Sequence, residues 1–135
     1  MTMKTIFFGY DQQGPPDARK NYLELAGYRV RSFASSADLL AAFKKKVPDA
    51  VVMDVLMEGR NGFEIAETLN REYAPRSFPM IVCTRFYRTR GFREHARQCG
   101  VDEYLLTPIS LQDFLAAVNE AIKNYQAQSE VDEAA

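Results

Sequence analysis

The chain has 135 residues, of which 47% are hydrophobic and 26% are charged, and this is the size and composition of one soluble globular domain. Its 17 basic and 18 acidic residues give a net charge of -1, so the overall charge selects neither nucleic acid nor an anionic membrane as a partner. Cys83 and Cys99 lack CxxC spacing and His95 is the single histidine, which argues against a zinc or disulfide framework.

Short runs of β-branched and aromatic residues alternate with segments of helical periodicity, a pattern typical of parallel strands joined by crossover helices. The predicted strands are Thr5–Gly9, Tyr28–Phe33, Ala50–Met53, Met80–Cys83 and Glu103–Leu106. The first, third and fourth of these are apolar throughout, as expected for central strands that are covered on both faces.

Helix starts are marked by prolines and serines, and helix ends by glycines and a proline. The first predicted helix runs from Pro15–Pro16 to about Ala26, and the second from a cap at Ser35 or Ser36 to before Pro48. The third begins after Gly62, and the fourth lies in an arginine-rich stretch that ends at Cys99 and Gly100. The fifth runs from a cap at Ser110 to Tyr125. Residues 126–135 have no apolar pattern and are predicted to be a flexible tail, which leaves residues 1–125 as one domain.

No apolar run approaches the roughly 18 residues that span a bilayer. The first segment, MTMKTIFFGYDQ, turns polar too early for a signal peptide. We therefore expect a cytoplasmic protein that does not bind membranes.

Polar side chains follow several of the predicted strands. In an open parallel sheet, the reactive crevice lies beyond the carboxyl ends of the strands. The residues at these ends are Tyr10 and Asp11 after the first strand, Asp54 after the third, Thr84 after the fourth, and Thr107 with Pro108 after the fifth. We expect all of these positions to face one pocket.

The segment VVMDVLMEGRNGFE, with Thr84, Tyr104 and Thr107-Pro108, resembles the receiver domains of two-component response regulators over about residues 4–125. The resemblance implies an α/β, flavodoxin-like (β/α)5 fold, a doubly wound five-stranded parallel sheet of order 2-1-3-4-5. It also implies that Asp54 is the phosphoacceptor, that Thr84 is the switch hydroxyl and that Tyr104 is the switch aromatic residue. The chain would then be a signalling module and not an enzyme.

A carboxylate is a weak nucleophile toward a phosphoryl group because both are anions, so a divalent cation has to neutralise them. Mg²⁺ prefers carboxylate oxygens, waters and phosphate oxygens as ligands. The expected protein ligands are Asp11, Asp54 and the backbone carbonyl of Leu56. The Thr84 hydroxyl would hydrogen-bond a phosphoryl oxygen.

Two residues depart from the pattern of the family. Tyr10 stands where a second acid is usual, which predicts weaker Mg²⁺ binding. Thr107 stands in place of a lysine, whose charge-assisted hydrogen bond would contribute on the order of 1.5 to 3 kcal/mol. Arg85, directly after Thr84, is a candidate compensating cation that would bind the phosphoryl group bidentately.

The stretch around the fourth helix combines arginines with aromatic residues, which suits a protein-binding surface, whereas a solvated helix face is the plainer alternative. The candidate residues are Arg88, Arg93, Arg97 and Tyr104. Nucleic-acid binding ranks third because no recognition motif accompanies the charge.

The leading hypothesis is a single-domain receiver in a phosphorelay, a monomer or weak dimer that accepts its phosphoryl group on Asp54. Its partners would be a sensor histidine kinase or phosphotransfer protein and a separate downstream protein, because only about ten residues follow the last predicted helix. The alternative is a degenerate receiver that acts as a phosphate-independent interaction module, which Tyr10, Arg85 and Thr107 favour. A flavin-binding protein ranks low, since the two prolines of YDQQGPP cannot donate hydrogen bonds to a phosphate.

Overall fold

The computed structural model describes residues 3–14 and 18–134, with side chains described as far as residue 126. Within these residues the strands are β1 (Thr5–Gly9), β2 (Arg29–Phe33), β3 (Ala50–Asp54), β4 (Met80–Thr84) and β5 (Glu103–Leu106). The helices are α1 (Arg19–Leu25), α2 (Ser36–Lys45), α3 (Gly62–Glu72), α4 (Arg90–Gln98) and α5 (Leu111–Ala134). The predicted helix start at Pro15–Pro16 lies outside the described residues.

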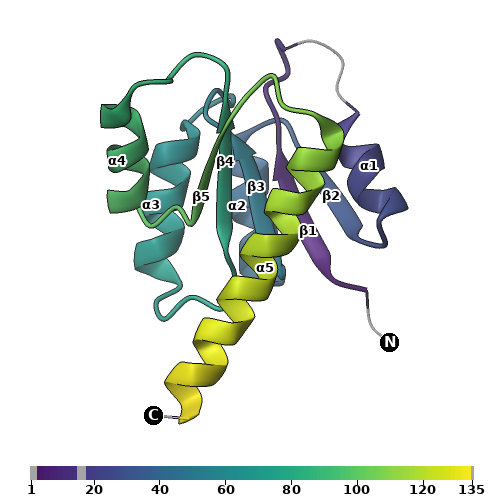
Figure 1. Ribbon diagram of the computed structural model, residues 1–135. Helices are drawn as coiled ribbons and strands as arrows, with labels where there is room; N and C mark the ends of the chain where they lie inside the picture. The colour runs from purple at the N-terminus through teal and green to yellow at the C-terminus, as the bar shows by residue number, and fades with distance from the viewer. Residues whose placement is uncertain (1–2, 15–17, 135) are drawn as a thin grey trace.

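The strands form one parallel sheet in the order β2-β1-β3-β4-β5, which confirms the predicted fold class. The apolar strands β1, β3 and β4 are the central ones. Helices α1 and α5 cover one face of the sheet, and α2, α3 and α4 cover the other (Figure 1). The core therefore has two halves, one on each side of the sheet.

Alternation along each central strand distributes its side chains between the two halves, as the period of two in a strand requires. In β1, for example, Phe7 packs with the residues of α2 and α3, while Ile6 and Phe8 pack with those of α1 and α5. Both faces of the central strands are thus buried, which explains their continuous apolar sequence.

Side-chain caps fix the starts of three helices. The Ser35 hydroxyl accepts a hydrogen bond from the Asp38 amide at 3.2 Å, and the Ser110 hydroxyl accepts one from the Asp113 amide at 3.0 Å, as the sequence predicts. Asn61 forms a capping box with Glu64 at the start of α3, a cap that our sequence analysis missed.

Residues 126–134, which the sequence predicts to be a flexible tail, continue α5 as a helix to Ala134. Residues 126–134 are rich in alanine, glutamine and glutamate, which have high helix propensity, and they contain no proline or glycine to end the helix. Figure 1 shows this end of α5 extending past the sheet. No helix in the described part of the chain is long and apolar enough to cross a membrane.

Candidate functional site

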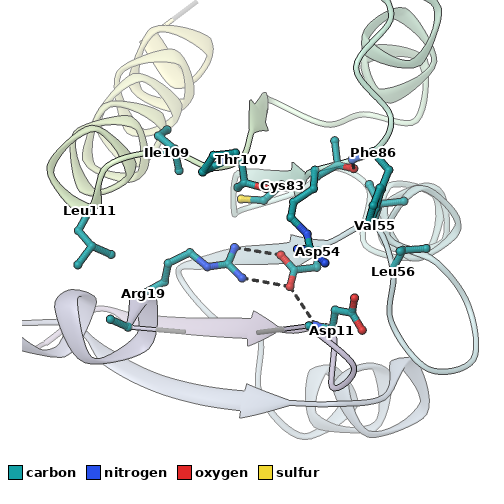
Figure 2. Close-up of a pocket in the computed structure, with 15 residues that line it drawn as sticks. Asp11, Arg19, Asp54, Val55, Leu56, Cys83, Phe86, Thr107, Ile109 and Leu111 are labelled. Atoms are coloured by element: carbon teal, nitrogen blue, oxygen red, sulfur yellow. Dashed lines mark hydrogen bonds and ion pairs between the residues drawn. The ribbon is translucent and has the colours of Figure 1, made fainter. Parts of the chain in front are cut away.

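A pocket of about 310 Å³ lies at the carboxyl edge of the sheet (Figure 2). Its lining includes Asp11, Asp54, Thr84 and Thr107, so the strand-end rule correctly predicted the position of these residues. Parallel register brings them together, since Asp54 pairs with Cys83 and the strands β1, β3, β4 and β5 end at the same edge. The pocket joins residues that are far apart in the sequence.

Tyr10 does not face this pocket, although all of the strand-end residues were expected to. Its ring stacks on that of Phe8, with the ring centroids 6.4 Å apart, and packs against the α1 and α5 half of the core. An aromatic ring at this position gains more from apolar contact than from exposure in a polar pocket. Tyr10 therefore supplies neither a charge nor a ligand there.

Asp54 ends β3, and Asp11 lies directly beside it. The Asp11 amide donates a hydrogen bond of 2.9 Å to Asp54 Oδ2, and Asp11 Oδ1 accepts one of 2.9 Å from the Gln13 amide. Asp11 thus fixes its own loop through its carboxylate and orients the Asp54 carboxylate through its backbone. Both aspartates line the pocket, as the sequence predicted.

Arg19 forms the closest charged contact of Asp54, and our sequence analysis missed it. Its Nη1 lies 2.9 Å from Asp54 Oδ1 and its Nη2 lies 3.1 Å from Oδ2, so the pair is bidentate (Figure 2). The guanidinium carbon also lies 4.9 Å from the centroid of the Phe8 ring and 5.7 Å from that of Phe114. Arg19 begins α1, whose start the sequence placed at Pro15–Pro16, so the strand-end rule did not point to this residue.

Thr107 and Arg85 both line the pocket. The Thr107 amide donates to the Thr84 carbonyl at 2.8 Å, which joins the loop after β5 to the end of β4. The exposed Arg85 places its guanidinium carbon 4.9 Å from the centroid of the Phe86 ring. In this structure Arg19 is the arginine that contacts Asp54, and compensation for the missing lysine by Arg85 stays a prediction.

Thr84 connects the pocket to Tyr104 through the loop that follows β4. The Thr84 hydroxyl accepts hydrogen bonds from the Phe86 amide at 3.1 Å and the Tyr87 amide at 3.2 Å, and it keeps its own proton for another acceptor. The Tyr104 hydroxyl in turn donates to the Tyr87 carbonyl at 2.7 Å. Both Thr84 and Tyr104 are only 6% exposed, so movement of one has to displace this loop or break a buried hydrogen bond.

Replacing Tyr104 with phenylalanine is expected to lower the free energy of unfolding near neutral pH by about 1 kcal/mol, because the Tyr87 carbonyl loses its donor. Burial raises the pKa of Tyr104. The wild type therefore keeps this residue's contribution below the pKa of an unfolded tyrosine, about 10, and loses it as the pH rises through the higher folded value. Urea unfolding of the wild type and the variant at pH 7 to 11 would measure both effects. If both proteins lost the same stability at alkaline pH, the predicted contribution of Tyr104 to the pH dependence would be contradicted.

Of the four candidate surface residues, Tyr104 is buried, whereas the three arginines are exposed and each has a contact within the domain. Arg88 donates to the Thr107 carbonyl at 2.9 Å, and Arg93 donates to the Tyr104 carbonyl at 3.2 Å. Arg97 pairs with Glu94 on the same helix, and this pairing raises the pKa of Arg97 and lowers that of Glu94. Arg88 thus ties the loop before α4 to the loop after β5, and Arg93 ties α4 to β5.

The groups expected to bind Mg²⁺ do not form a metal site as they are arranged. Among the described residues, no group of three or more histidine, cysteine, aspartate and glutamate side chains could hold a metal ion. Of the expected ligands, Asp11 and Asp54 supply two carboxylates, and Leu56 lines the same pocket. Both oxygens of Asp54 already contact Arg19, so as arranged the site does not fit a divalent cation.

A doubly wound sheet with two aspartates and a buried threonine lining a pocket at its carboxyl edge is the arrangement that the sequence resemblance implies. The model of the response regulator receiver domain family matches residues 11–119. The chain therefore belongs to the response regulator receiver domain family, as the sequence predicted. Receiver domains generally bind Mg²⁺ in this acidic pocket, whereas here Arg19 contacts Asp54.

Relatives agree with this assignment. The chain is 29% identical over 106 residues to the polar-differentiation response regulator DivK of Brucella ovis, an alignment covering 78% of this chain and 82% of DivK. It is 26% identical over 110 residues to the heme response regulator HssR of Staphylococcus epidermidis, covering 82% of this chain and 47% of HssR. The chain thus spans about half the length of HssR.

Solved structures show the same fold. A CheY-like receiver domain from Methanospirillum hungatei superposes with a TM-score of 0.83 at 22% identity, covering 94% of this chain and 99% of that one. A response regulator from Chloroflexus aurantiacus superposes with a TM-score of 0.76 at 25% identity, covering 90% of this chain and 99% of that one.

Proposed function

We propose that residues 1–125 act as a cytoplasmic phosphorelay receiver that accepts a phosphoryl group on Asp54. The observation that carries this proposal is the shared pocket, in which the Asp54 carboxylate and the Thr84 hydroxyl lie together at the carboxyl edge of the sheet. A core-packing role requires neither an acid nor a hydroxyl at these positions, so their joint presence favours chemistry at this edge.

In the proposed reaction, an Asp54 oxygen attacks the phosphorus of a phosphohistidine on a sensor histidine kinase or phosphotransfer protein. The O–P bond forms as the P–N bond breaks, and the histidine nitrogen keeps the electron pair. Because Arg19 holds both Asp54 oxygens, it has to release at least one of them before the attack. The Thr84 proton, which the two loop amides leave available, then donates to a phosphoryl oxygen.

The signal would travel through the loop after β4. Drawing the Thr84 hydroxyl toward the phosphoryl group pulls on the amides of Phe86 and Tyr87, and the Tyr87 carbonyl is the acceptor of Tyr104. The response of Tyr104 changes the surface formed by α4 and β5. A separate downstream protein would bind this surface at Arg88, Arg93 and Arg97.

A phosphate-independent interaction module is the second candidate function. Two observations favour it: Thr107 replaces the usual lysine, and Arg19 neutralises Asp54 without any phosphoryl group. Under this hypothesis the Arg19–Asp54 pair is a structural contact, and the downstream protein binds whether or not a phosphodonor is present.

The test is incubation of the purified protein with acetyl phosphate and Mg²⁺, followed by intact mass spectrometry and amide NMR, with Asp54→Ala as the control. We expect a mass increase of one phosphoryl group that the control lacks, and amide shifts that reach Thr84, Tyr87 and Tyr104. Absence of labelling with kinase-derived phosphohistidine as well as acetyl phosphate would exclude the receiver function and leave the interaction module.

A further inference from the structure

We propose that Arg19 is the resident cation of the acidic pocket and competes with a divalent cation for Asp54. The inference deepens the proposed function, because it concerns the same carboxylate, but its test measures metal binding and needs no phosphorylation. Arg19 lies in the first turn of α1, away from the strand ends, and its role would be to hold the Asp54 carboxylate in place.

The geometry of the Arg19–Asp54 contact is that of a strong ion pair. Two parallel N–H···O hydrogen bonds of 2.9 and 3.1 Å engage both carboxylate oxygens. The side chains are 12% and 16% exposed, so water screens their attraction less than it screens a surface pair. A metal ligand needs at least one of these oxygens, and each already has a charged donor.

Aromatic contacts hold the Arg19 guanidinium where it is. The group lies over the rings of Phe8 in β1 and Phe114 in α5, which come from the half of the core that α1 covers. A guanidinium stacked on aromatic rings and paired with a carboxylate has more than one favourable contact to lose when it moves. Displacing Arg19 from Asp54 would therefore cost the ring contacts as well as the ion pair.

The charge balance explains why Arg19 and a metal ion exclude each other. Asp11 and Asp54 contribute two negative charges and Arg19 returns one positive charge, so these three groups leave only a single negative charge. A divalent cation bound to Asp54 would lie within a few ångströms of the guanidinium and would be repelled by it. Tyr10, which packs away from the pocket, adds no charge to offset this repulsion.

The test is a Mg²⁺ titration followed by the amide signals of Asp11 and Asp54, in the wild type, in Arg19→Gln and in Lys20→Gln. Lys20 is the matched control because it is the next residue of α1, carries the same charge and pairs with Glu24 at the surface. We expect Arg19→Gln to bind Mg²⁺ on the order of tenfold more tightly than the wild type. We expect Lys20→Gln to change the affinity by less than about twofold, since its charge is exposed and screened.

An unchanged or weaker affinity in Arg19→Gln, with circular dichroism showing a folded protein, would overturn the proposal. Should that variant fail to fold, the wild type decides the question through the side-chain Nε–H signal of Arg19. Competition predicts that this signal shifts as Mg²⁺ saturates the site, whereas shifts of the Asp11 and Asp54 amides alone would refute it. A failure of phosphorylation changes none of these measurements, so the two proposals fail separately.

Discussion

Replacing Arg76 with alanine is expected to lower the free energy of unfolding by about 3 kcal/mol. Arg76 is 11% exposed, and its guanidinium joins three segments at the edge of the sheet opposite the pocket. It donates to Asn70 Oδ1 at 2.9 Å, to the Phe78 carbonyl at 2.8 Å, to the Gly100 carbonyl at 2.8 Å and to Asp102 Oδ2 at 3.0 Å. Alanine would leave two partly buried carbonyls without these donors and remove the charge that faces Asp102.

Urea unfolding, monitored by circular dichroism, would measure this loss against two further variants. Arg71→Ala removes an arginine from the exposed face of α3 and is expected to change stability by less than about 0.5 kcal/mol. Arg76→Lys keeps the charge but not the fork of donors, so an intermediate loss is expected. A loss in Arg76→Ala no larger than that in Arg71→Ala would show that this network contributes nothing measurable.

The fold was predictable from the sequence because its strands are buried on both faces and its helices on one. Continuous apolar runs identify β1, β3 and β4 as central strands, and the helical period between them requires parallel crossovers. Differences are confined to element ends. Asp54 and Thr84 belong to their strands, although both were read as the residues that follow them.

The acidic residues of the site were predictable for a similar reason, since the carboxyl ends of parallel strands always meet at one edge. Arg19 was not, because its contact with Asp54 depends on where α1 starts above that edge, which no strand pattern specifies. Arg85 was chosen for its position next to Thr84 in the sequence. Arg85 does line the pocket, and its guanidinium lies over the Phe86 ring.

The close approach at Gly62 is a further feature that the sequence pattern did not reveal. Gly62 begins α3, and its amide donates to the Val55 carbonyl at 2.8 Å. A β-carbon added there would lie 2.8 Å from the Asp54 carbonyl oxygen and 3.1 Å from the Val55 α-carbon. Both neighbours are backbone atoms at the end of β3, so they cannot rotate out of the way as a side chain would.

Replacing Gly62 with alanine is therefore expected to lower the free energy of unfolding by about 2 kcal/mol, within the range for overpacking. The displacement should also reach Asp54 and slow its labelling by acetyl phosphate, because the added methyl group pushes on the peptide that carries the carboxylate. Urea unfolding and labelling kinetics of the same sample would measure the two effects together.

Gly91→Ala provides the matched control, since Gly91 also lies in the first turn of a helix, α4. A β-carbon there would meet only Thr89 Oγ1 at 3.8 Å, an ordinary contact, so the higher helix propensity of alanine should leave stability unchanged or raise it by up to about 1 kcal/mol. Opposite signs for two identical substitutions would show that contact with the end of β3, and not helix propensity, requires glycine at position 62. Equal effects would mean that α3 can shift without disturbing Asp54, and normal labelling of Gly62→Ala would confirm that reading.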